Sequence, residues 1–572
     1  MGRSNSEEPV EHKRRTMQRN SSWTRFRRGL QQSIHRMKVS QLNRQGVIPE
    51  ELAALTYLAV LKIDQNAFTG TLPPFLGNFS DMVILSLAHN RFFGTIPKEL
   101  GNLKELAMLA VSSNNFSGSL PPELGNLVKM QQIYLDSSGV GGEIPSTFAN
   151  LTDMLVLWAS DSPFSGKIPP FIGTWTKLDS LVIRNALVAG PVPTDINQLQ
   201  DLHTLDLSFN NLNGSLPQTL MNMSSLFSLF LGNNSLSGSL LTDKSENLQN
   251  IDLSYNQLSG SFPRWVIRTW SMANLQLNLV VNNFRFDSTN ISTFPGLHCL
   301  QRGFPCNRNT TPYSSFAIKC GGSEMRSMNN ILFETENDTT IGPASYYLFQ
   351  EKWAVSSVGI AIDRSDPSFI ASTSIQVDNT RYPELYRTSR KSPGSLRYYG
   401  LGMENGPYTI SLFFAETVFN RTPNTWQGHG RRVFDIYIQG NRRQKDFDIS
   451  KEAGGVGRAL VKDFDVNVTQ NYLEIHLFWA GKGTCYFKVK SNSNKTGMII
   501  GVVAAVTSVS LLLLVFGLYM KKKRSKHGEE DVFLGMGPKV KTCTYAELRT
   551  ATADFSSSNL LGEGGFGPVY KV

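Results

Sequence analysis

The 572-residue sequence predicts an α/β solenoid, followed by an all-β sandwich and one membrane-spanning helix. Three observations predict this order of parts. A frame of leucines recurs every 24 residues in the first half, short alternating strands follow it, and a 24-residue run without a charge lies beyond them. With 40% hydrophobic and 18% charged residues, the composition is that of a folded protein rather than a disordered one.

The repeat is clearest in the spacing of asparagines. Asn66, Asn90 and Asn114 lie 24 residues apart, and nine units with the same leucine frame fit between Leu55 and Pro263. Each unit supplies one short strand to a shared core, and the asparagine bonds backbone groups at the turn, so several units must stack before any of them is stable. Three units carry another residue at the asparagine position, which predicts a departure from a uniform solenoid: Ser138, Ser162 and Ala186.

This frame, with its Gly-x-Ile/Leu-Pro ending, resembles the plant-type leucine-rich repeat of plant receptor kinases. We therefore expect leucine-rich repeats at residues 41–265, after an atypical basic N-terminus at 1–40 that we expect to be disordered. A degenerate repeat and a cysteine cap should follow at 266–312. We expect Cys299 and Cys306 to form a disulfide there, because the open end of a solenoid core needs protection.

Alternating strands replace the repeat from about residue 315, which predicts a β-sandwich. The clearest strands are residues 408–416, 433–438 and 472–478. Four phrases of this region look like a malectin-like domain: Ala317-Ile-Lys-Cys-Gly-Gly322, Phe413-Phe-Ala-Glu416, Arg432-Val-Phe-Asp-Ile-Tyr437 and Trp479-Ala-Gly-Lys-Gly-Thr-Cys485. We place that domain at 313–490.

The malectin resemblance implies carbohydrate binding by stacked aromatic rings. Tyr346, Tyr347, Tyr398 and Tyr399 are candidates, although paired aromatics in strands more often belong to a core. We expect a second disulfide between Cys320 and Cys485, the latter close to the membrane-spanning run. In the family a further strand separates this cysteine from the membrane, so we expect a less stable domain or one refilled by residues 486–490.

The uncharged run is residues 497–520, which at 1.5 Å per residue extends about 36 Å, enough to cross a bilayer as a transmembrane helix. A Lys-Lys-Lys-Arg cluster follows, so the positive-inside rule places it in the cytoplasm and the N-terminus outside. All Asn-X-Ser/Thr sequons precede the run: Asn78, Asn115, Asn150, Asn213, Asn222, Asn233, Asn290, Asn309, Asn337, Asn420, Asn467 and Asn494. Residues 1–40 contain no apolar signal segment, and the run itself could act as a signal-anchor.

The charge distribution argues against nucleic acid as a partner. Residues 41–520 carry 37 basic and 37 acidic side chains. The net charge of +10 therefore comes from residues 1–40, at +7, and from 521–572, at +3. No broad basic face is left to bind phosphates.

The end of the sequence carries a glycine-rich motif. After a juxtamembrane segment at 521–553, residues 554–572 resemble the start of a protein kinase domain of plant receptor kinases. The resemblance implies an ATP-binding loop formed by Leu561, Gly562, Gly564, Phe566, Gly567 and Val569. The third-strand Lys and the two Asp residues of a kinase lie beyond such a loop, so we expect the chain to be truncated within the kinase and inactive in phosphotransfer. A complete family kinase would use ATP and Mg; we expect no metal site in this chain.

A candidate ligand patch lies on the concave face of repeats four to six. Tyr134 and Trp158 occupy equivalent places in neighbouring strands, which lie about 4.8 Å apart in a sheet. Asp136, Asp161 and Arg184 surround them. Exposed aromatics with an arginine nearby are the usual anchors of interfaces.

Together these features predict an α/β leucine-rich-repeat solenoid, an all-β malectin-like sandwich, one transmembrane helix and a fragment of a kinase N-lobe. The resemblance implies a single-pass plasma-membrane receptor of the plant receptor serine/threonine kinase family, binding a peptide, protein or wall glycan, with a possible co-receptor kinase. Two alternatives remain. The chain could be a kinase-less decoy or scaffold receptor, or a wall-glycan adhesion module.

Overall fold

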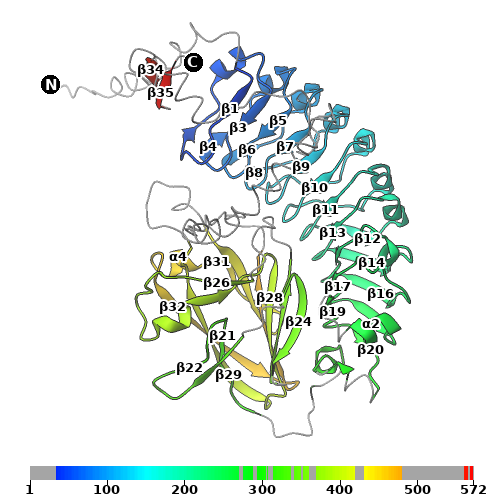
Figure 1. Cartoon of the computed structure of the whole chain (residues 1–572), viewed down its shortest axis with the longest axis vertical. Helices are drawn as coiled ribbons and strands as arrows, with labels where there is room; N and C mark the ends of the chain where they lie inside the picture. The colour runs from blue at the N-terminus through cyan, green and yellow to red at the C-terminus, as the bar shows by residue number, and fades with distance from the viewer. Residues whose placement is uncertain are drawn as a thin grey trace, which may run out of the picture. The chain divides into compact units, whose positions relative to one another are not determined.

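The computed structural model describes residues 34–269, 275–287, 293–294, 296–303, 306, 313–336, 341–349, 352–359, 369–418 and 431–479, and the backbone of 560–564 and 567–570. The chain divides into two compact units. One is Leu30–Phe487, and the other joins Met1–Gly29 to Lys488–Val572. The repeats and the all-β domain both belong to the first unit (Figure 1).

The leucine frame builds one long parallel sheet of 11 strands (Figure 1). Each repeat contributes one three-residue strand, and its central apolar residue enters the core, as Leu61, Leu85 and Leu109 do in three successive strands. In order along the sheet the strands are β1 (Arg36–Lys38), β3 (Val60–Lys62), β5 (Ile84–Ser86), β7 (Met108–Ala110), β9 (Gln132–Tyr134), β10 (Val156–Trp158), β11 (Ser180–Val182), β13 (Thr204–Asp206), β15 (Ser228–Phe230), β17 (Asn250–Asp252) and β19 (Gln276–Asn278).

Both end strands lie outside the nine expected units. Strand β1 falls within residues 1–40, which we expected to be disordered, and pairs with β3 through Arg36 and Val60. The backbone N–H groups of Ala59 and Val60 donate to the His35 carbonyl oxygen, so β1 satisfies the edge that the first leucine-bearing strand would otherwise expose. Strand β19 forms the degenerate repeat expected after residue 265.

The helical elements of the repeats are 3-10 helices, not the α-helices that the α/β class implies. They are η1 (Glu50–Ala54), η2 (Pro74–Asn78), η3 (Lys98–Asn102), η4 (Pro122–Asn126), η5 (Ser146–Asn150), η6 (Pro170–Thr174), η7 (Thr194–Gln198) and η8 (Leu220–Asn222). Each of η1 to η7 follows a proline in extended conformation. Short connecting pieces of this length are typical of 3-10 helices. One short α-helix, α2 (Arg264–Thr269), ends this series.

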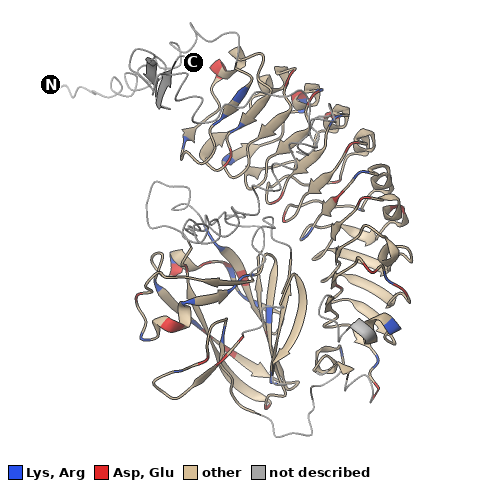
Figure 2. Ribbon diagram, viewed as in Figure 1, with Lys and Arg blue, Asp and Glu red and all other residues tan. Residues whose placement is uncertain are grey.

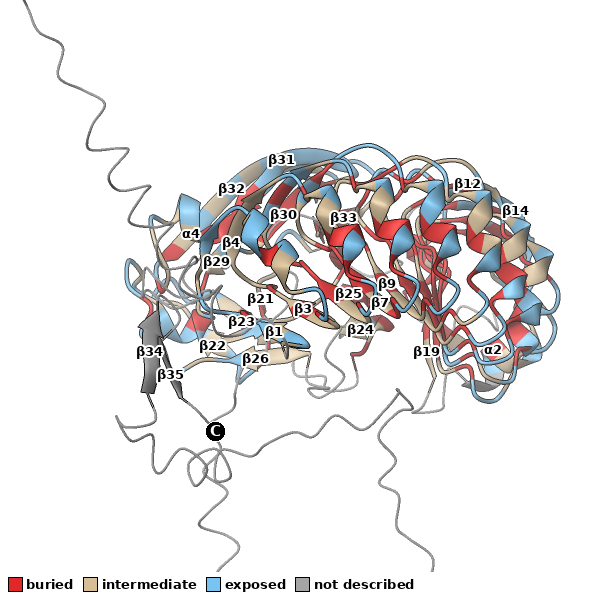
Figure 3. Cartoon of the chain, turned by 90° about the horizontal axis from the view of Figure 1, so that it is seen from above, coloured by how far each residue is buried: buried red, intermediate tan, exposed pale blue. Residues whose placement is uncertain are grey.

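Several neighbouring 3-10 helices approach so closely that only glycine fits between them. A Cβ atom on Gly77 would lie 2.2 Å from the carbonyl oxygen of Glu99 in the next repeat, and one on Gly101 would lie 2.4 Å from that of Glu123. The same helices present a buried stripe toward the core and an exposed stripe outward (Figure 3). The Leu-Gly-Asn part of the frame is therefore a packing requirement.

The asparagine ladder is confirmed. Asn90 Nδ2 donates to the Ile63 carbonyl oxygen of the preceding repeat at 2.9 Å and to that of Leu87 in its own repeat at 3.1 Å. Its Oδ1 accepts from the Phe68 N–H at 3.0 Å. One side chain thus satisfies backbone groups of two repeats.

The ladder changes in the three units without asparagine. Ser162 Oγ donates to the Leu135 carbonyl oxygen at 3.0 Å and accepts from the Ser138 N–H at 3.1 Å. The serine hydroxyl therefore forms some of the hydrogen bonds that an asparagine amide forms in the other repeats. Ala186 has no polar side chain, and its N–H donates instead to Asn210 Oδ1 of the next repeat at 3.2 Å.

Most repeats have a second strand between the strand of the long sheet and the 3-10 helix, and this second layer is interrupted. A four-stranded sheet comprises β2 (Gln45–Gly46), β4 (Ala67–Gly70), β6 (Arg91–Gly94) and β8 (Asn115–Phe116). A five-stranded sheet comprises β12 (Ala189–Pro191), β14 (Asn211–Ser215), β16 (Ser235–Ser239), β18 (Gln257–Gly260) and β20 (Asn283–Phe284). Only isolated bridges connect the described residues between these sheets, where the ladder lacks asparagine. The expected departure from a uniform solenoid is therefore found.

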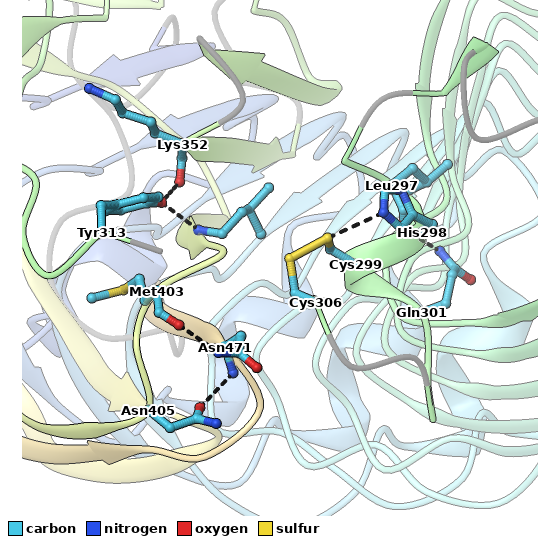
Figure 4. Close-up of a disulfide and its surroundings, with 11 residues drawn as sticks. Leu297, His298, Cys299, Gln301, Cys306, Tyr313, Lys352, Met403, Asn405 and Asn471 are labelled. Carbon is cyan, nitrogen blue, oxygen red and sulfur yellow. Dashed lines mark hydrogen bonds between the residues drawn. A yellow bond between two sulfur atoms is a disulfide. The ribbon is translucent and has the colours of Figure 1, made fainter. Parts of the chain in front are cut away.

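A disulfide closes the far end of the core, as expected. Cys299 and Cys306 are bonded and buried, and Cys299 belongs to the short helix η9 (His298–Leu300) (Figure 4). The Cys306 N–H donates to the carbonyl oxygen of Gln470 in the all-β domain at 3.4 Å. The cap therefore also links the two domains.

Replacing Cys299 with Ser should lower the free energy of unfolding by about 2 kcal/mol, because the disulfide closes a short loop and constrains the unfolded chain. Urea denaturation of the variant and the wild type measures this difference. The control is Cys543→Ser, which replaces a cysteine outside the described residues and is compared with the wild type by the same urea denaturation. An equal midpoint for Cys299→Ser and wild type would contradict a structural role for the cap.

The all-β domain is the expected sandwich. Its largest sheet runs in the order β24 (Ala344–Phe349), β25 (Trp353–Val358), β28 (Ser395–Leu401), β33 (Tyr472–Phe478), β30 (Val433–Ile438) and β31 (Asn441–Asp448). A ten-residue pair, β29 (Gly406–Ala415) and β32 (Ala459–Val468), faces it, and the two share a core that includes Trp353, Ile436 and Phe447. The remaining elements are β21 (Ile318–Lys319), β22 (Met325–Arg326), β23 (Leu332–Thr335), β26 (Ile370–Ser372), β27 (Thr388–Arg390), η10 (Pro383–Tyr386) and α4 (Ile449–Glu452).

Among the described strands, β29 and β32 pair only with each other. Residues 486–490, which we expected to refill a missing strand, lie outside the described residues, as does Cys485. Cys320 is a free thiol among the described residues, and its expected disulfide with Cys485 stays a prediction. Its sulfur lies 3.1 Å from the hydroxyl of Tyr398, in a buried polar cluster.

In the described part of the chain, no helix is both long and apolar enough to cross a membrane. The run at 497–520, the juxtamembrane segment 521–553 and most sequons after Asn233 lie outside that part. Charges of both signs are scattered over the described surface (Figure 2), as the neutral count for residues 41–520 predicts.

Candidate ligand-binding face

The aromatic pair predicted on the concave face is formed. Tyr134 ends β9 and Trp158 ends β10, and the two are direct partners in the parallel register. Their ring centroids lie 5.7 Å apart with planes at 80°, an edge-to-face contact. Trp158 Nε1 donates to Ser180 Oγ at 2.9 Å, which fixes the indole. Both side chains remain partly accessible to solvent, so the pair forms a rigid, partly exposed apolar surface, called the half-open pair below.

The charged residues expected around the pair lie next to it but are buried. Arg184 Nη2 lies 3.0 Å from Asp161 Oδ2, and these side chains are 8% and 0% exposed. Asp136 Oδ1 accepts from the Ser160 N–H at 2.9 Å, and burial raises the pKa of Asp136 to about 6. Burial alone would lower the pKa of Arg184, but the carboxylates of Asp161, Asp206 and Asp136 raise it overall. These charged groups are therefore interior residues that bond to one another and to the backbone, and they do not form a solvent-exposed rim around the aromatic pair.

The second domain covers Arg184. The ring of Trp479 lies 5.1 Å from the Arg184 guanidinium carbon, a cation–π contact. A Cβ atom added to Gly394 would lie 2.6 Å from Arg184 Nη1, so the two domains are in close contact there. Repeat six is therefore where the all-β domain begins to occupy the concave face.

Beyond Arg184, side chains that the repeat frame places on the concave face are buried, not exposed. Asp206 and Asp252 are 5% and 0% exposed, and Phe230 packs against Ala344 and Val358 of the all-β domain. Strand β24 lies against β17 and β19 (Figure 1). Tyr134 and Trp158 are thus on the last two strands before the covered part of the face.

A second set of positions makes this interdomain contact, and the sequence analysis missed it. From Gln65 to Val281, the residue before each ladder position has a positive φ of 49–58°. In the early repeats this residue is small or polar, as Gln65, His89 and Ser113 are, but later it is Phe209 and Tyr255. Large side chains rarely adopt this conformation. Two aromatics in it are the signal that could have revealed the contact.

Arg397 on β28 is the centre of the interface. Its guanidinium carbon lies 3.8 Å from the ring of Tyr255 and 5.8 Å from that of Phe209. Nη2 donates to Asn233 Oδ1 at 2.8 Å, and Nε lies 3.1 Å from Glu474 Oε1. Tyr255 donates its hydroxyl to Glu474 Oε1 at 2.6 Å, which closes a network across the two domains.

Two titratable groups beside Arg397 have pKa values shifted in the direction that favours their neutral forms. Burial raises the pKa of Asp252 to about 7, although Ser254 donates its hydroxyl to this carboxyl at 2.7 Å. Burial lowers the pKa of His476 well below its usual value, and the positive charge of Arg397 lowers it further. His476 Nε2 lies 2.9 Å from Ser395 Oγ. The interface thus avoids most unpaired charge.

Other candidate positions are placed as follows. Asn150, a sequon that could have shielded the aromatic pair, ends η5 on the helical side of the solenoid, across the core from the strands. Of the candidate sugar-stacking tyrosines in the all-β domain, Tyr346, Tyr398 and Tyr399 are buried and Tyr347 is 38% exposed. Three of the four are therefore core residues.

The glycine-rich motif forms a two-stranded hairpin in its backbone. Strand β34 (Leu560–Gly564) pairs antiparallel with β35 (Gly567–Tyr570), with Gly564 opposite Gly567. Leu561, Gly562, Gly564, Gly567 and Val569 lie on these strands, whereas Phe566 lies outside the described residues. The assignment of this hairpin to ATP remains a prediction.

Comparisons with known proteins agree with this architecture. A family model described as the malectin domain matches residues 314–502, one described as a leucine-rich repeat region matches 109–315, and a single leucine-rich repeat matches 82–103. Two probable leucine-rich repeat receptor-like serine/threonine-protein kinases of Arabidopsis thaliana are each 44% identical over 330 residues. The matched part is 53% of this chain and 32% of each relative, so the chain spans about a third of their length.

The solved structures that are similar include a plant peptide hormone receptor, RGFR1, in complex with RGF2. It is 32% identical, covers 44% of this chain and 40% of its own, and has a TM-score of 0.42. The family models, the repeat geometry and the sandwich agree on one order of domains. The chain carries a leucine-rich repeat region followed by a malectin domain, and over this part it is similar to plant leucine-rich repeat receptor-like serine/threonine kinases.

Proposed function

We propose that the chain is a single-pass plasma-membrane receptor whose repeats and malectin domain face the outside. Residues 497–520 would cross the membrane. Extracellular ligand binding would occur at the half-open pair of Tyr134 and Trp158. Signalling would need a protein kinase that uses ATP and Mg, either continuous with the hairpin at 560–570 or supplied by a co-receptor. The similarity to receptor-like kinases over 330 residues supports this assignment.

The aromatic pair carries the proposal. It is the place where two large apolar rings, fixed by mutual contact and by Ser180, stay partly open beside the covered part of the concave face. Rigid aromatics of this kind bury much area at little entropic cost when a partner binds. The pair suits a peptide side chain or a sugar ring equally, so the ligand class must be found by experiment.

Changing Tyr134 and Trp158 together to Ala should weaken ligand binding at least tenfold, because each ring is expected to contribute more than about 1 kcal/mol. The full chain in nanodiscs would be exposed to secreted plant peptides and to wall oligosaccharides in separate channels, and binding followed by interferometry. Pretreating each fraction with protease or glycosidase identifies the ligand class.

The control is the double variant Tyr57→Ala with Phe93→Ala. Those aromatics are 50% and 45% exposed and lie in earlier repeats, away from the pair. Thermal melts of both variants establish that the fold is kept. Full affinity in the Tyr134 and Trp158 variant would end the assignment of the ligand face to this pair.

A further inference from the structure

The sequon at Asn233 lies in the contact between the repeats and the malectin domain. Asn233, Asn234 and Ser235 form the acceptor motif, and Asn233 has a positive φ of 55° at the edge of its repeat. Asn233 Oδ1 accepts a hydrogen bond from Arg397 Nη2 at 2.8 Å. The side chain is therefore part of the network centred on Arg397.

The atom that would carry a glycan has no room. Asn233 Nδ2 is buried and has no hydrogen-bond partner among the described residues. Arg397, 3% exposed, lies directly against the amide and is fixed by Tyr255 and Glu474. An N-glycan replaces one hydrogen of Nδ2 with a sugar carbon, and the bulky chain must then extend into solvent. The docked arrangement of the two domains cannot accommodate that.

The other sequons in the described part of the chain differ in this respect, because their asparagines are exposed residues. They are Asn78, Asn115, Asn150, Asn213, Asn222 and Asn467. Asn78, Asn150 and Asn222 end 3-10 helices, on the opposite side of the core from the long sheet. A glycan at any of these six positions is compatible with docking. Asn233 stands apart by its location, not by its motif.

Asn233 could be glycosylated before the malectin domain is synthesised. Asn233 precedes Arg397 by 164 residues, so its repeat is made before the domain that covers it. We propose that N-glycosylation of Asn233 and docking of the malectin domain onto the repeats exclude one another. The sequon is then a modification site only in molecules whose two domains are apart, and an attached glycan keeps them apart. This inference rests on the proposed extracellular location.

The covalent step is an ordinary glycosyl transfer from a lipid-diphosphate-linked oligosaccharide. The bond between the anomeric carbon and the phosphate oxygen breaks, and a bond from Asn233 Nδ2 to that carbon forms. The lipid diphosphate leaves with the electron pair, and Nδ2 loses one proton. No oxidant or reductant takes part. Since Nδ2 is the reacting atom, its burial against Arg397 blocks the reaction in the docked state.

The test is site-specific glycan occupancy in the full chain expressed in plant cells. Peptide mass spectrometry after enzymatic deglycosylation in heavy-oxygen water reports the occupancy at each asparagine. Asn213 is the internal control, because its motif also ends in serine and it is exposed one repeat earlier. We expect occupancy at Asn233 to be several-fold lower than at Asn213 in the wild type. It should rise several-fold in Arg397→Ala, with Asn213 unchanged.

A second measurement does not depend on the variant. Limited proteolysis separates wild-type molecules with docked domains, which resist cleavage between them, from molecules that are cleaved. Asn233 should be bare in the resistant fraction and modified in the cleaved one. Ser235→Ala, which removes the motif and leaves Asn233 in place, should raise the resistant fraction.

The outcomes are distinguishable. A glycan at Asn233 in the resistant fraction would overturn the inference, and so would a bare Asn233 in both the cleaved fraction and Arg397→Ala while Asn213 is modified. Absence of glycan from every sequon would instead overturn the extracellular location, and with it the inference.

Discussion

Replacing Arg397 with Ala is expected to separate the malectin domain from the repeats and to lower the stability of the chain by about 3–5 kcal/mol, the usual cost of stranding one partner of a buried ion pair. The guanidinium is 3% exposed and lies 3.1 Å from Glu474 Oε1. Without it, the Glu474 carboxylate stays buried with only Tyr255 as a donor from the repeats. Tyr255 and Phe209 also lose the cation over their rings.

The separation has its own signature. Backbone amides of β17, β19 and β24, which lie against one another in the docked state, should exchange with deuterium much faster in the variant. The core strands of each domain should keep their protection. Thermal unfolding should change from one transition to two, because the domains would no longer melt as one cooperative unit.

Arg442→Ala is the matched control. Arg442 is an arginine of the same domain, paired to Asp435 at 3.5 Å with its side chain 48% exposed. The Asp435 side chain is 4% exposed, but the half-exposed Arg442 is screened by solvent and the backbone N–H of Asp446 also donates to Asp435, so the loss should be smaller than for Arg397. Arg397→Lys should lie between the two, because it keeps the charge but loses the planar fork. Equal exchange and equal stability in Arg397→Ala and Arg442→Ala would show that the guanidinium does not hold the domains together.

Much of the solenoid could be predicted from the sequence, because the repeat constrains each position locally. The spacing of Leu61, Leu85 and Leu109 fixes the strands, and Asn90 bonds the same backbone groups that its spacing implies. Strand β1 could not be found this way. Its three residues carry no leucine frame, and it forms only because β3 offers an unpaired edge.

The interface between the domains was harder to predict, because it depends on which distant surfaces meet. The repeat frame places Phe230 on the concave face, where it would be exposed in a solenoid considered alone, but it is buried against Ala344 of β24 and Val358 of β25. Burial also changes the role expected of a charged side chain on this face. Arg184 looks like an interface anchor in the sequence, yet in the structure it is an interior cation covered by Trp479. Only the aromatics at positive φ, Phe209 and Tyr255, carried a local sign of this contact.

Disulfide pairing also differs between cysteines that are close in the sequence and cysteines that are far apart. Cys299 and Cys306 are close in sequence and next to the end of the core, so their bond followed from the need for a cap. The pairing of Cys320 with Cys485 had no such local argument, and in the structure Cys320 is a free thiol while Cys485 lies outside the described residues. The Cys320 thiol belongs to a polar cluster inside the malectin domain, and burial raises its pKa to about 12. A thiol kept protonated in this way is a poor nucleophile.

That cluster leads to the second large effect. Glu336→Ala should destabilise the malectin domain by about 3–5 kcal/mol, because it leaves the cation of Arg390 buried and unpaired. Glu336 Oε1 lies 2.6 Å from Arg390 Nη2, with side chains 0% and 1% exposed. Tyr398 donates its hydroxyl to Glu336 Oε2 at 2.8 Å, so the substitution also leaves a phenol without its acceptor.

Cys320 provides the measurement, because its sulfur lies 3.1 Å from the Tyr398 hydroxyl. In the wild type, alkylation of Cys320 by iodoacetamide should require opening of the domain, and mass spectrometry of the Cys320 peptide follows its rate. Glu336→Ala should speed alkylation at least a hundredfold, the factor that corresponds to about 3 kcal/mol of easier opening. Arg387→Ala, which breaks an exposed pair with Glu384, should leave the rate nearly unchanged.

A double variant separates the charge from the packing. If the unpaired cation is the cause, Glu336→Leu with Arg390→Met should recover much of the loss, because a buried ion pair can be replaced by apolar side chains of similar size at little cost. If the lost acceptor for Tyr398 is the cause, the double variant should remain as labile as Glu336→Ala, and adding Tyr398→Phe should then restore protection of Cys320. A Cys320 that reacts at the same rate in all of these proteins would mean that the cluster does not hold the domain closed.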